Sequence, residues 1–309
     1  MKRRDFLKNT AASSALLTLG GLSLSSFDTT ETTSEIKKIT ILHTNDVHSH
    51  IDPFPADHPK NPNMGGVARR AALIEQIRKE EKNVLLLDAG DIFQGTPYFN
   101  YYGGELEFKL MSMLQYDLAT MGNHDFDNGI DGFYAQLPHA KFDFVSANYD
   151  FKNTILNDII KPYKILHKDG IKIGIFGLGV ELQGLVSPQL YKETVYNNPV
   201  EIAQDMTRIL KQEKNCDLVI CLSHLGFKYT NEPEKICDVN LARQTKDIDL
   251  IIGGHTHTFL EKPVIEKNKD GKEVMINQVG CYGINLGRID FYFNPKSKTG
   301  SGNGRSIIV

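Results

Sequence analysis

Seven side chains able to bind a divalent metal ion occur in this 309-residue sequence at one kind of position, directly after short apolar runs. They are carboxylates, a carboxamide and imidazoles, with no thiolate among them: Asp46, His48, Asp91, Asn123, His224, His255 and His257. Such donors suit first-row ions such as Mn, Fe, Co or Zn and do not select one of them. A tetrahedral catalytic ion typically uses about three protein ligands, so seven are too many for a single ion. Two ions that share a carboxylate would use them all, and such a pair activates water for attack on phosphorus.

The apolar runs before these residues have the length and composition of buried β-strands. They cover residues 39–42, 84–87, 118–121, 218–222 and 250–252. Helical periodicity appears elsewhere, in residues 66–80, 106–114 and 200–211. Strands that alternate with helices in this way predict an α/β fold with mostly parallel central strands. Because ligands bind beyond the carboxyl ends of such strands, the five polar clusters should meet at one edge.

Each cluster alone has an ordinary structural explanation. Asp46 and His48 could be a helix cap beside an unrelated histidine, and the Gly-Asp pair at 90–91 could be a turn. His255 and His257 would share one face of a strand and could form a polar rim. The occurrence of all five clusters, each after an apolar strand, favours a functional site over five separate coincidences.

Together, these motifs resemble the calcineurin-like metallophosphoesterases. The matching strings are DVH at 46–48, GD at 90–91, GNHD at 122–125, SH at 223–224 and GHTH at 254–257. Three longer strings, HTNDVHSHID, GDIFQGTPYFN and GNHDFDNG, are similar to the catalytic domain of bacterial 5′-nucleotidases, UDP-sugar hydrolases and 2′,3′-cyclic phosphodiesterases. The resemblance covers roughly residues 36–294 and implies a four-layer α-β-β-α sandwich.

The resemblance also implies a role for each residue. One ion would be held by Asp46, His48, Asp91 and His257, and the other by Asp91, Asn123, His224 and His255. His124 would stabilise the transition state or protonate the leaving oxygen, and a metal-bound hydroxide would attack. Asp127 would orient the His124 ring, and Asp125 is the alternative that the sequence does not exclude. Four neighbouring polar residues could orient ligands or be ordinary loop residues: His43, His50, Asp52 and Gln94.

The N-terminal residues have the features of an export signal. A basic start with the Arg3-Arg4 pair precedes a short apolar segment at 11–22 and a polar stretch, which is typical of a twin-arginine signal. We expect a signal peptide and spacer at 1–35, a catalytic domain at 36–294 and a flexible Ser/Gly/Lys-rich tail at 295–309. The expected location is the periplasm, with no stable membrane span after the signal is removed.

The net charge argues against one class of function, and the cysteines are expected to be structural. The formal net charge is −3, and removal of residues 1–26, with four basic residues and one acidic residue, makes it −6. This balance argues against a nucleic-acid partner, and so against a nuclease. Four cysteines without a CxxC pair are expected in the core, although the sequence leaves a disulfide open: Cys216, Cys221, Cys237 and Cys281.

The expected function is therefore that of an exported, metal-dependent phosphoric ester hydrolase acting on nucleotides or related phosphate esters. Family members with full nucleotidase activity carry a second, C-terminal domain that contacts the base. We expect this second domain to be supplied by a separate chain or to be lacking. Its lack would leave a less selective enzyme. The alternatives are a sulfur-ester hydrolase of the same fold and a catalytically silent metal-binding or partner-docking module.

Overall fold

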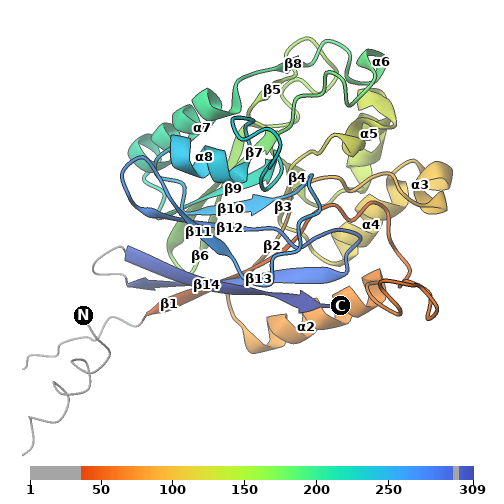
Figure 1. Cartoon of the computed structure of the whole chain (residues 1–309), viewed down its shortest axis with the longest axis horizontal. Coiled ribbons are helices and arrows are strands. Elements are labelled where there is room, and N and C mark those ends of the chain that lie inside the picture. Colours follow the sequence, from red (N-terminus) through yellow and green to blue (C-terminus); the bar gives the residue numbers. More distant parts are fainter. Residues whose placement is uncertain (1–35, 295–298) are drawn as a thin grey trace, which may run out of the picture. The chain divides into compact units, whose positions relative to one another are not determined.

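Two six-stranded mixed sheets form the centre of the computed structural model, which describes residues 36–294 and 299–309 (Figure 1). The first sheet contains, in spatial order, β14 (Thr299–Ile308), β13 (Asn285–Asn294), β1 (Lys37–Thr44), β2 (Val84–Asp88), β3 (Leu118–Ala119) and β4 (Asp143–Phe144). The second contains β11 (Val264–Lys267), β12 (Glu273–Asn277), β10 (Leu250–Gly253), β9 (Leu218–His224), β7 (Ile171–Gly179) and β6 (Tyr163–Lys168). A small ribbon joins β5 (Tyr149–Asp150) and β8 (Val195–Tyr196).

Parallel pairing is confined to the middle of each sheet. Strands β1, β2, β3 and β4 are parallel neighbours, as are β7, β9, β10 and β12. Antiparallel strands β13, β14, β6 and β11 complete the outer parts of the two sheets. The predicted arrangement of mostly parallel central strands is therefore confirmed.

Side chains alternate between two apolar layers along each central strand, which is why these runs are almost entirely hydrophobic. In β9, Leu218, Ile220 and Leu222 point into the core between the sheets, whereas Val219 and Cys221 point to the opposite face. Helices α7 (Pro199–Arg208) and α8 (Asp238–Gln244) cover that opposite face. Strands β1 and β2 follow the same rule in the first sheet.

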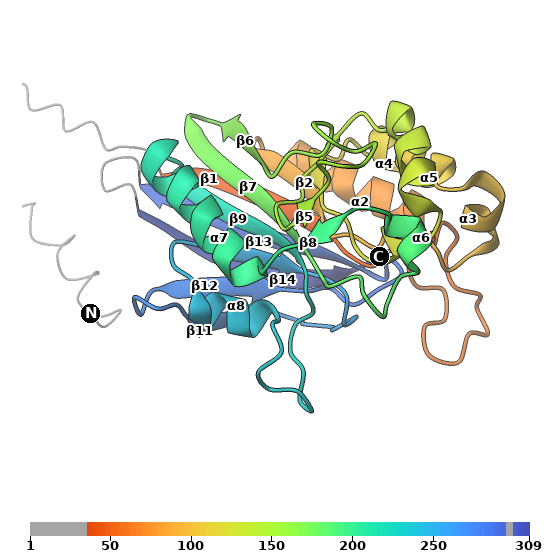
Figure 2. The same cartoon turned by 90° about the horizontal axis from the view of Figure 1, so that it is seen from above.

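The outer face of the first sheet carries its own helices: α2 (Val67–Glu80), α4 (Glu105–Met113) and α5 (Gly129–Gln136). Figure 1 shows α7 and α8 above the paired sheets and α2 below them, and in Figure 2, which is seen from above, α7 lies in front of the strands. Short helices α3 (Pro97–Tyr102) and α6 (Pro188–Tyr191) belong to the connecting segments. The molecule thus has four layers in the order helices, sheet, sheet and helices, with an apolar core between each pair of neighbouring layers. This order confirms the four-layer α-β-β-α sandwich.

The predicted flexible tail at 295–309 is wrong for residues 299–308. These residues form β14, which pairs with β13 over its whole length. Gly300 lies opposite Phe293 and Gly302 opposite Phe291, and a Cβ atom on either glycine would press on the opposite ring. The glycines leave room for these rings to cover the neighbouring backbone, so a Gly/Ser-rich composition here marks a packed strand.

Two further expectations concern membrane and redox chemistry. No helix among residues 36–294 and 299–309 is long and apolar enough to cross a membrane. All four cysteines are buried free thiols, which answers the disulfide question in favour of core residues. The predicted export signal, residues 1–35, lies outside the described residues.

The core between the sheets should control the stability of the site that they carry. Leu222→Ala removes a fully buried side chain two residues before His224 and should lower the free energy of unfolding by about 2–5 kcal/mol. Leu185→Ala, at a side chain that is 54% exposed, should change it by less than about 0.5 kcal/mol. Urea unfolding of both variants measures the difference, and equal losses would contradict this account of the core.

Candidate metal centre

The seven predicted ligands lie together beyond the carboxyl ends of the parallel strands. Asp46 and His48 follow β1, Asp91 follows β2, and His224 is the last residue of β9. Two groups have ligand atoms within 4.8 Å of one another: Asp46, His48 and His257 in the first, and Asp91, His224 and His255 in the second. The remaining predicted ligand, Asn123, has its side-chain oxygen 2.8 Å from Nδ1 of His255.

Five of these seven residues have a left-handed backbone conformation that only glycine adopts freely. Their φ values lie between 49° and 75°: Asp46, His48, Asp91, His255 and His257. Residues held in this region persist where the surrounding structure determines them, and they cluster at functional sites. Hydrogen bonds close to the ligand residues must therefore hold this strained backbone in place.

Asp125 is one such anchor. Its buried carboxylate accepts hydrogen bonds from four backbone N–H groups, those of Asp91 (3.0 Å), Ile92 (2.9 Å), Phe93 (3.2 Å) and Gly122 (2.8 Å). Burial, followed by the charge of Asp91, raises the pKa of Asp125 to about 7, although the amide donors oppose that rise. Asp125 thus holds the loop after β2, and its hydrogen bonds go to that loop and to Gly122.

Asn45 anchors the loop after β1, which carries Asp46 and His48. Its amide nitrogen donates to Asp46 Oδ2 (2.5 Å) and to the carbonyl of Gly280 (2.7 Å), and its oxygen accepts from the N–H of Val279 (3.0 Å). The N–H of His255 donates to Asp46 Oδ1 at 2.9 Å. The Asp46 carboxylate is therefore oriented by groups from both sheets.

Gly122 is required by close packing. A Cβ atom at this position would collide with the Asp91 carboxylate and with the ring of His224. The absence of a side chain allows Asp91 and His224 to approach to 3.0 Å, and both are buried. The glycine of the GNHD motif is thus explained by the space that the ligands occupy.

The protonation pattern of the buried histidines leaves ligand atoms directed at the centre. His224 donates from Nδ1 to the carbonyl of Ala89 (2.7 Å), and its buried Nε2 lies 3.0 Å from Asp91 Oδ2 without the alignment of a hydrogen bond. His48 donates from Nδ1 to the carbonyl of Phe93 (3.2 Å), which leaves its Nε2 3.0 Å from Nε2 of His257. Two such nitrogen atoms repel each other unless a proton or a cation lies beside them.

Charge in the centre also favours cations. Burial opposes ionisation of Asp91, but the neighbouring His224 outweighs it and lowers the pKa of that carboxyl. Burial likewise opposes a charged His224, and Asp91 raises its pKa to about 10 against that effect. A buried carboxylate that recruits protons onto its histidine neighbours would be neutralised equally by divalent ions. The donor set therefore fits two cations.

His124 and Asp127 form a separate pair at the mouth of the centre. His124 Nδ1 lies 2.8 Å from Asp127 Oδ2, and the two side chains are 36% and 28% exposed. The hydrogen bond that His124 donates to Asp127 raises the pKa of His124 in spite of its partial burial. The ring of His124 stands 5.2 Å from that of His48. Of the two carboxylates left open by the sequence, Asp127 is thus the one that contacts the imidazole.

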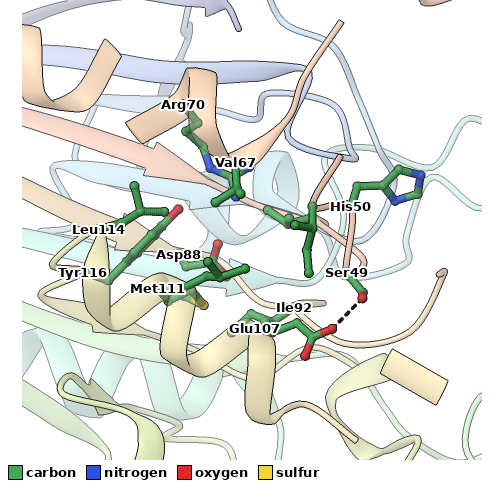
Figure 3. Close-up of a pocket in the computed structure, with 13 residues that line it drawn as sticks. Ser49, His50, Val67, Arg70, Asp88, Ile92, Glu107, Met111, Leu114 and Tyr116 are labelled. Atoms are coloured by element: carbon green, nitrogen blue, oxygen red, sulfur yellow. Dashed lines mark hydrogen bonds between the residues drawn. The ribbon is translucent and has the colours of Figure 1, made fainter. Parts of the chain in front are cut away.

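A small cavity of about 20 Å³, lined mostly by apolar side chains with a few polar groups, lies beside the loop after β1 (Figure 3). Arg70, which is 4% exposed, has no partner for Nε or Nη1 among the described residues, and Glu107 leaves Oε2 unpaired there. Ser49 donates to the other Glu107 oxygen at 2.5 Å. The cavity has room for about one water molecule, which could satisfy these groups. Glu107 thus supports the loop through Ser49, and Arg70 lines the cavity beside it.

The neighbouring polar residues have different positions. His43 is buried between the sheets and accepts from Asn277 at 2.9 Å, and burial lowers its pKa to about 3. Asp52 accepts from the hydroxyl of Tyr98 at 2.6 Å. Asn45, Arg70 and Tyr282 are not predicted from the sequence, because no motif connects them to their partners, most of which are distant in the chain.

Comparison with known proteins agrees with this geometry. The family profile described as calcineurin-like phosphoesterase matches residues 39–259. The chain is 37% identical to a snake venom 5′-nucleotidase from Naja atra over 296 residues, which are 88% of this chain and 53% of that protein. This confirms the resemblance predicted from the motifs.

Two solved structures are also similar. A 5′-nucleotidase precursor from Thermus thermophilus superposes with a TM-score of 0.78 and 32% identity, covering 88% of this chain and 55% of that one. The NAD nucleotidase of Haemophilus influenzae gives a TM-score of 0.75 and 29% identity, covering 89% and 49%. The chain thus spans about half the length of the relatives it matches.

Loss of the Asp125 anchor should loosen the centre. Asp125→Ala leaves four amide groups without their acceptor, and we expect the free energy of unfolding to fall by about 3 kcal/mol or more. The affinity of the apoprotein for Mn²⁺ or Zn²⁺, measured by calorimetry, should fall by about 10–100-fold. Asp131→Ala, at an exposed residue paired with Lys192, is the control. An unchanged metal affinity in Asp125→Ala would show that the anchor is dispensable.

Proposed function

Because this chain belongs to the calcineurin-like phosphoesterase family, we propose that it hydrolyses phosphate esters of nucleotides or related alcohols. The observation that carries the proposal is the joint arrangement of two ligand groups and a carboxylate-paired imidazole at one edge of the sheets. A sulfur-ester hydrolase or a silent metal-binding module would be the alternative. The His124–Asp127 pair supports an enzyme, because a module that only bound metal would not need an acid.

We propose that the two metal sites share Asp91. Asp46, His48, Asp91 and His257 would hold one ion, and Asp91, Asn123, His224 and His255 the other. When bound, such ions polarise the phosphoryl group and lower the pKa of water. The two sites can hold Mn, Zn, Fe or Co, because imidazole, carboxamide and carboxylate groups bind each of these ions.

His124 is proposed as the acid that acts on the leaving oxygen. Its imidazole is partly exposed beside the centre, where an ester could reach it, and donates from Nδ1 to Asp127, which raises its pKa. The other ring nitrogen is then free to donate a proton or a hydrogen bond to the oxygen that leaves phosphorus. Asp127 holds the ring and keeps it protonated.

Export and a partner chain complete the proposal. The Arg3-Arg4 segment supports export by the twin-arginine pathway to the periplasm, and relatives include a venom protein and a bacterial precursor. Recognition of the nucleoside with the help of a separate chain is a further part of the proposal.

Metal analysis coupled to a panel of esters tests the function. The metal-loaded protein should hydrolyse some of 5′-AMP, a 2′,3′-cyclic nucleotide, a UDP-sugar and p-nitrophenyl phosphate. Asp91→Ala should lose about two ions per chain and lower kcat/KM by about 10³-fold, because both ions lose their shared ligand. Asp131→Ala should retain the metal and the activity. A metal-loaded chain that hydrolyses none of these esters would favour the silent module.

The pH dependence tests the acid. Since Asp127 raises the pKa of His124, activity that needs the protonated ring is present below that pKa and is lost as pH rises through it. Asp127→Asn should therefore move the alkaline limb of the kcat/KM profile to lower pH. His124→Gln should lower kcat by about 10²–10⁴-fold. An alkaline limb that stays in place in Asp127→Asn would contradict the assigned role.

A further inference from the structure

Tyr282 is a large side chain held in a backbone conformation that large side chains rarely adopt. Its φ is 61°, between Gly280 (φ 79°) and Gly283 (φ 63°). Its N–H donates to the carbonyl of Asp46 at 2.7 Å, so this strained turn is tied directly to the loop that carries two predicted ligands. Strain of this kind, observed next to a candidate centre, justifies asking what the side chain does there.

The Tyr282 ring stands beside two predicted ligands. Its centroid lies 5.8 Å from that of His257 and 5.9 Å from that of His48, with the rings tilted or edge-on. It also contacts His50, with ring centroids 4.3 Å apart and the ring planes tilted by 35°. The ring thus forms an aromatic wall between the candidate metal centre and the loop at 50–58.

The aromatic contacts continue away from the centre. Phe54 lies 5.2 Å from His50 and 6.0 Å from Tyr282, and His58 lies 4.6 Å from Phe54. We call these four residues the aromatic ladder: Tyr282, His50, Phe54 and His58. All four are partly exposed, and none belongs to the three buried apolar clusters.

A purely structural explanation does not account for this arrangement well. A buried tyrosine usually finds a hydrogen-bond partner for its hydroxyl group, whereas Tyr282 is partly exposed and its hydroxyl has none among the described residues. An exposed aromatic group on a strained turn gives little to the core. Its position beside His257, the more exposed of the ligands in its group, places it where the rest of a bound ester would lie.

We propose that the aromatic ladder, led by Tyr282, is a stacking surface for a planar ring in the alcohol portion of the substrate. Every nucleobase and every aryl group has a π face that can stack on such a surface. The ladder would therefore make this chain favour nucleoside and aryl phosphates over phosphate esters without a ring. This inference rests on the proposed phosphoesterase function and names its substrate class.

Two substrates that differ only in the base test it, namely 5′-AMP and ribose 5-phosphate. The wild-type enzyme should have a KM for 5′-AMP about tenfold lower than for ribose 5-phosphate. Tyr282→Leu should raise the KM for 5′-AMP about tenfold, leave kcat within about twofold and leave ribose 5-phosphate kinetics unchanged. Tyr282→Phe should restore the preference, because it keeps the ring. Tyr101→Leu, at a tyrosine that is 82% exposed outside the ladder, should match the wild type.

Other results overturn the inference. Equal losses with both substrates in Tyr282→Leu, or loss of bound metal in that variant, would show that the ring only supports the centre. Equal KM values in the wild type would also refute it, while the phosphoesterase function would stand. If the wild type hydrolyses neither these two esters nor any ester of the panel above, the proposed function fails. The ladder would then be tested by calorimetric binding of the two esters to the metal-loaded proteins. The wild type should bind 5′-AMP about tenfold more tightly than ribose 5-phosphate, and Tyr282→Leu should lose this preference.

Discussion

The buried carboxylate of Asp91 is the constraint on which the rest of the site depends. It is 1% exposed and lies within 3.0 Å of His224 and 3.7 Å of His48, and it accepts from the N–H of His124 at 2.8 Å. Burying an ion of this kind is costly unless positive charge or donors surround it. The glycine at 122, the left-handed ligand residues and the inward-facing imidazoles all serve to bring such groups to one point.

The two sheets make this crowding possible. Parallel strands from both sheets end at the same edge, so loops that are far apart in sequence meet there, and the apolar layers on both faces hold the strand ends rigid. Asp125 and Asn45 then transfer that rigidity to the loops through backbone amides. A centre built in this way keeps strained ligand residues in place before any ion arrives.

The sequence predicts the features that depend on local composition and not those that depend on distant contacts. Buried strands and the ligands after them are visible because each depends on local composition: an apolar run, then a polar cluster. The prediction of a flexible tail is wrong because Gly/Ser-rich composition is typical of a loop, whereas here Gly300 and Gly302 lie opposite Phe293 and Phe291 in the β13–β14 hairpin. Asp125 and Asp127 follow the same histidine closely, and only the turn at His124–Phe126 shows which carboxylate faces the ring. Arg70 and Tyr282 act through distant partners and carry no motif.

Under the proposed function, recognition of the phosphate and recognition of the alcohol would depend on different parts of the molecule. Two cations and a protonated imidazole would bind any phosphomonoester in the same way, so they would confer no preference for one alcohol. Stacking on Tyr282 would distinguish ring-bearing from ring-free substrates, but it would accept every base because every base has a π face. A preference for one base requires hydrogen-bond donors and acceptors placed at its edge. Such a preference, measured in this chain alone, would point to polar residues beyond the aromatic ladder.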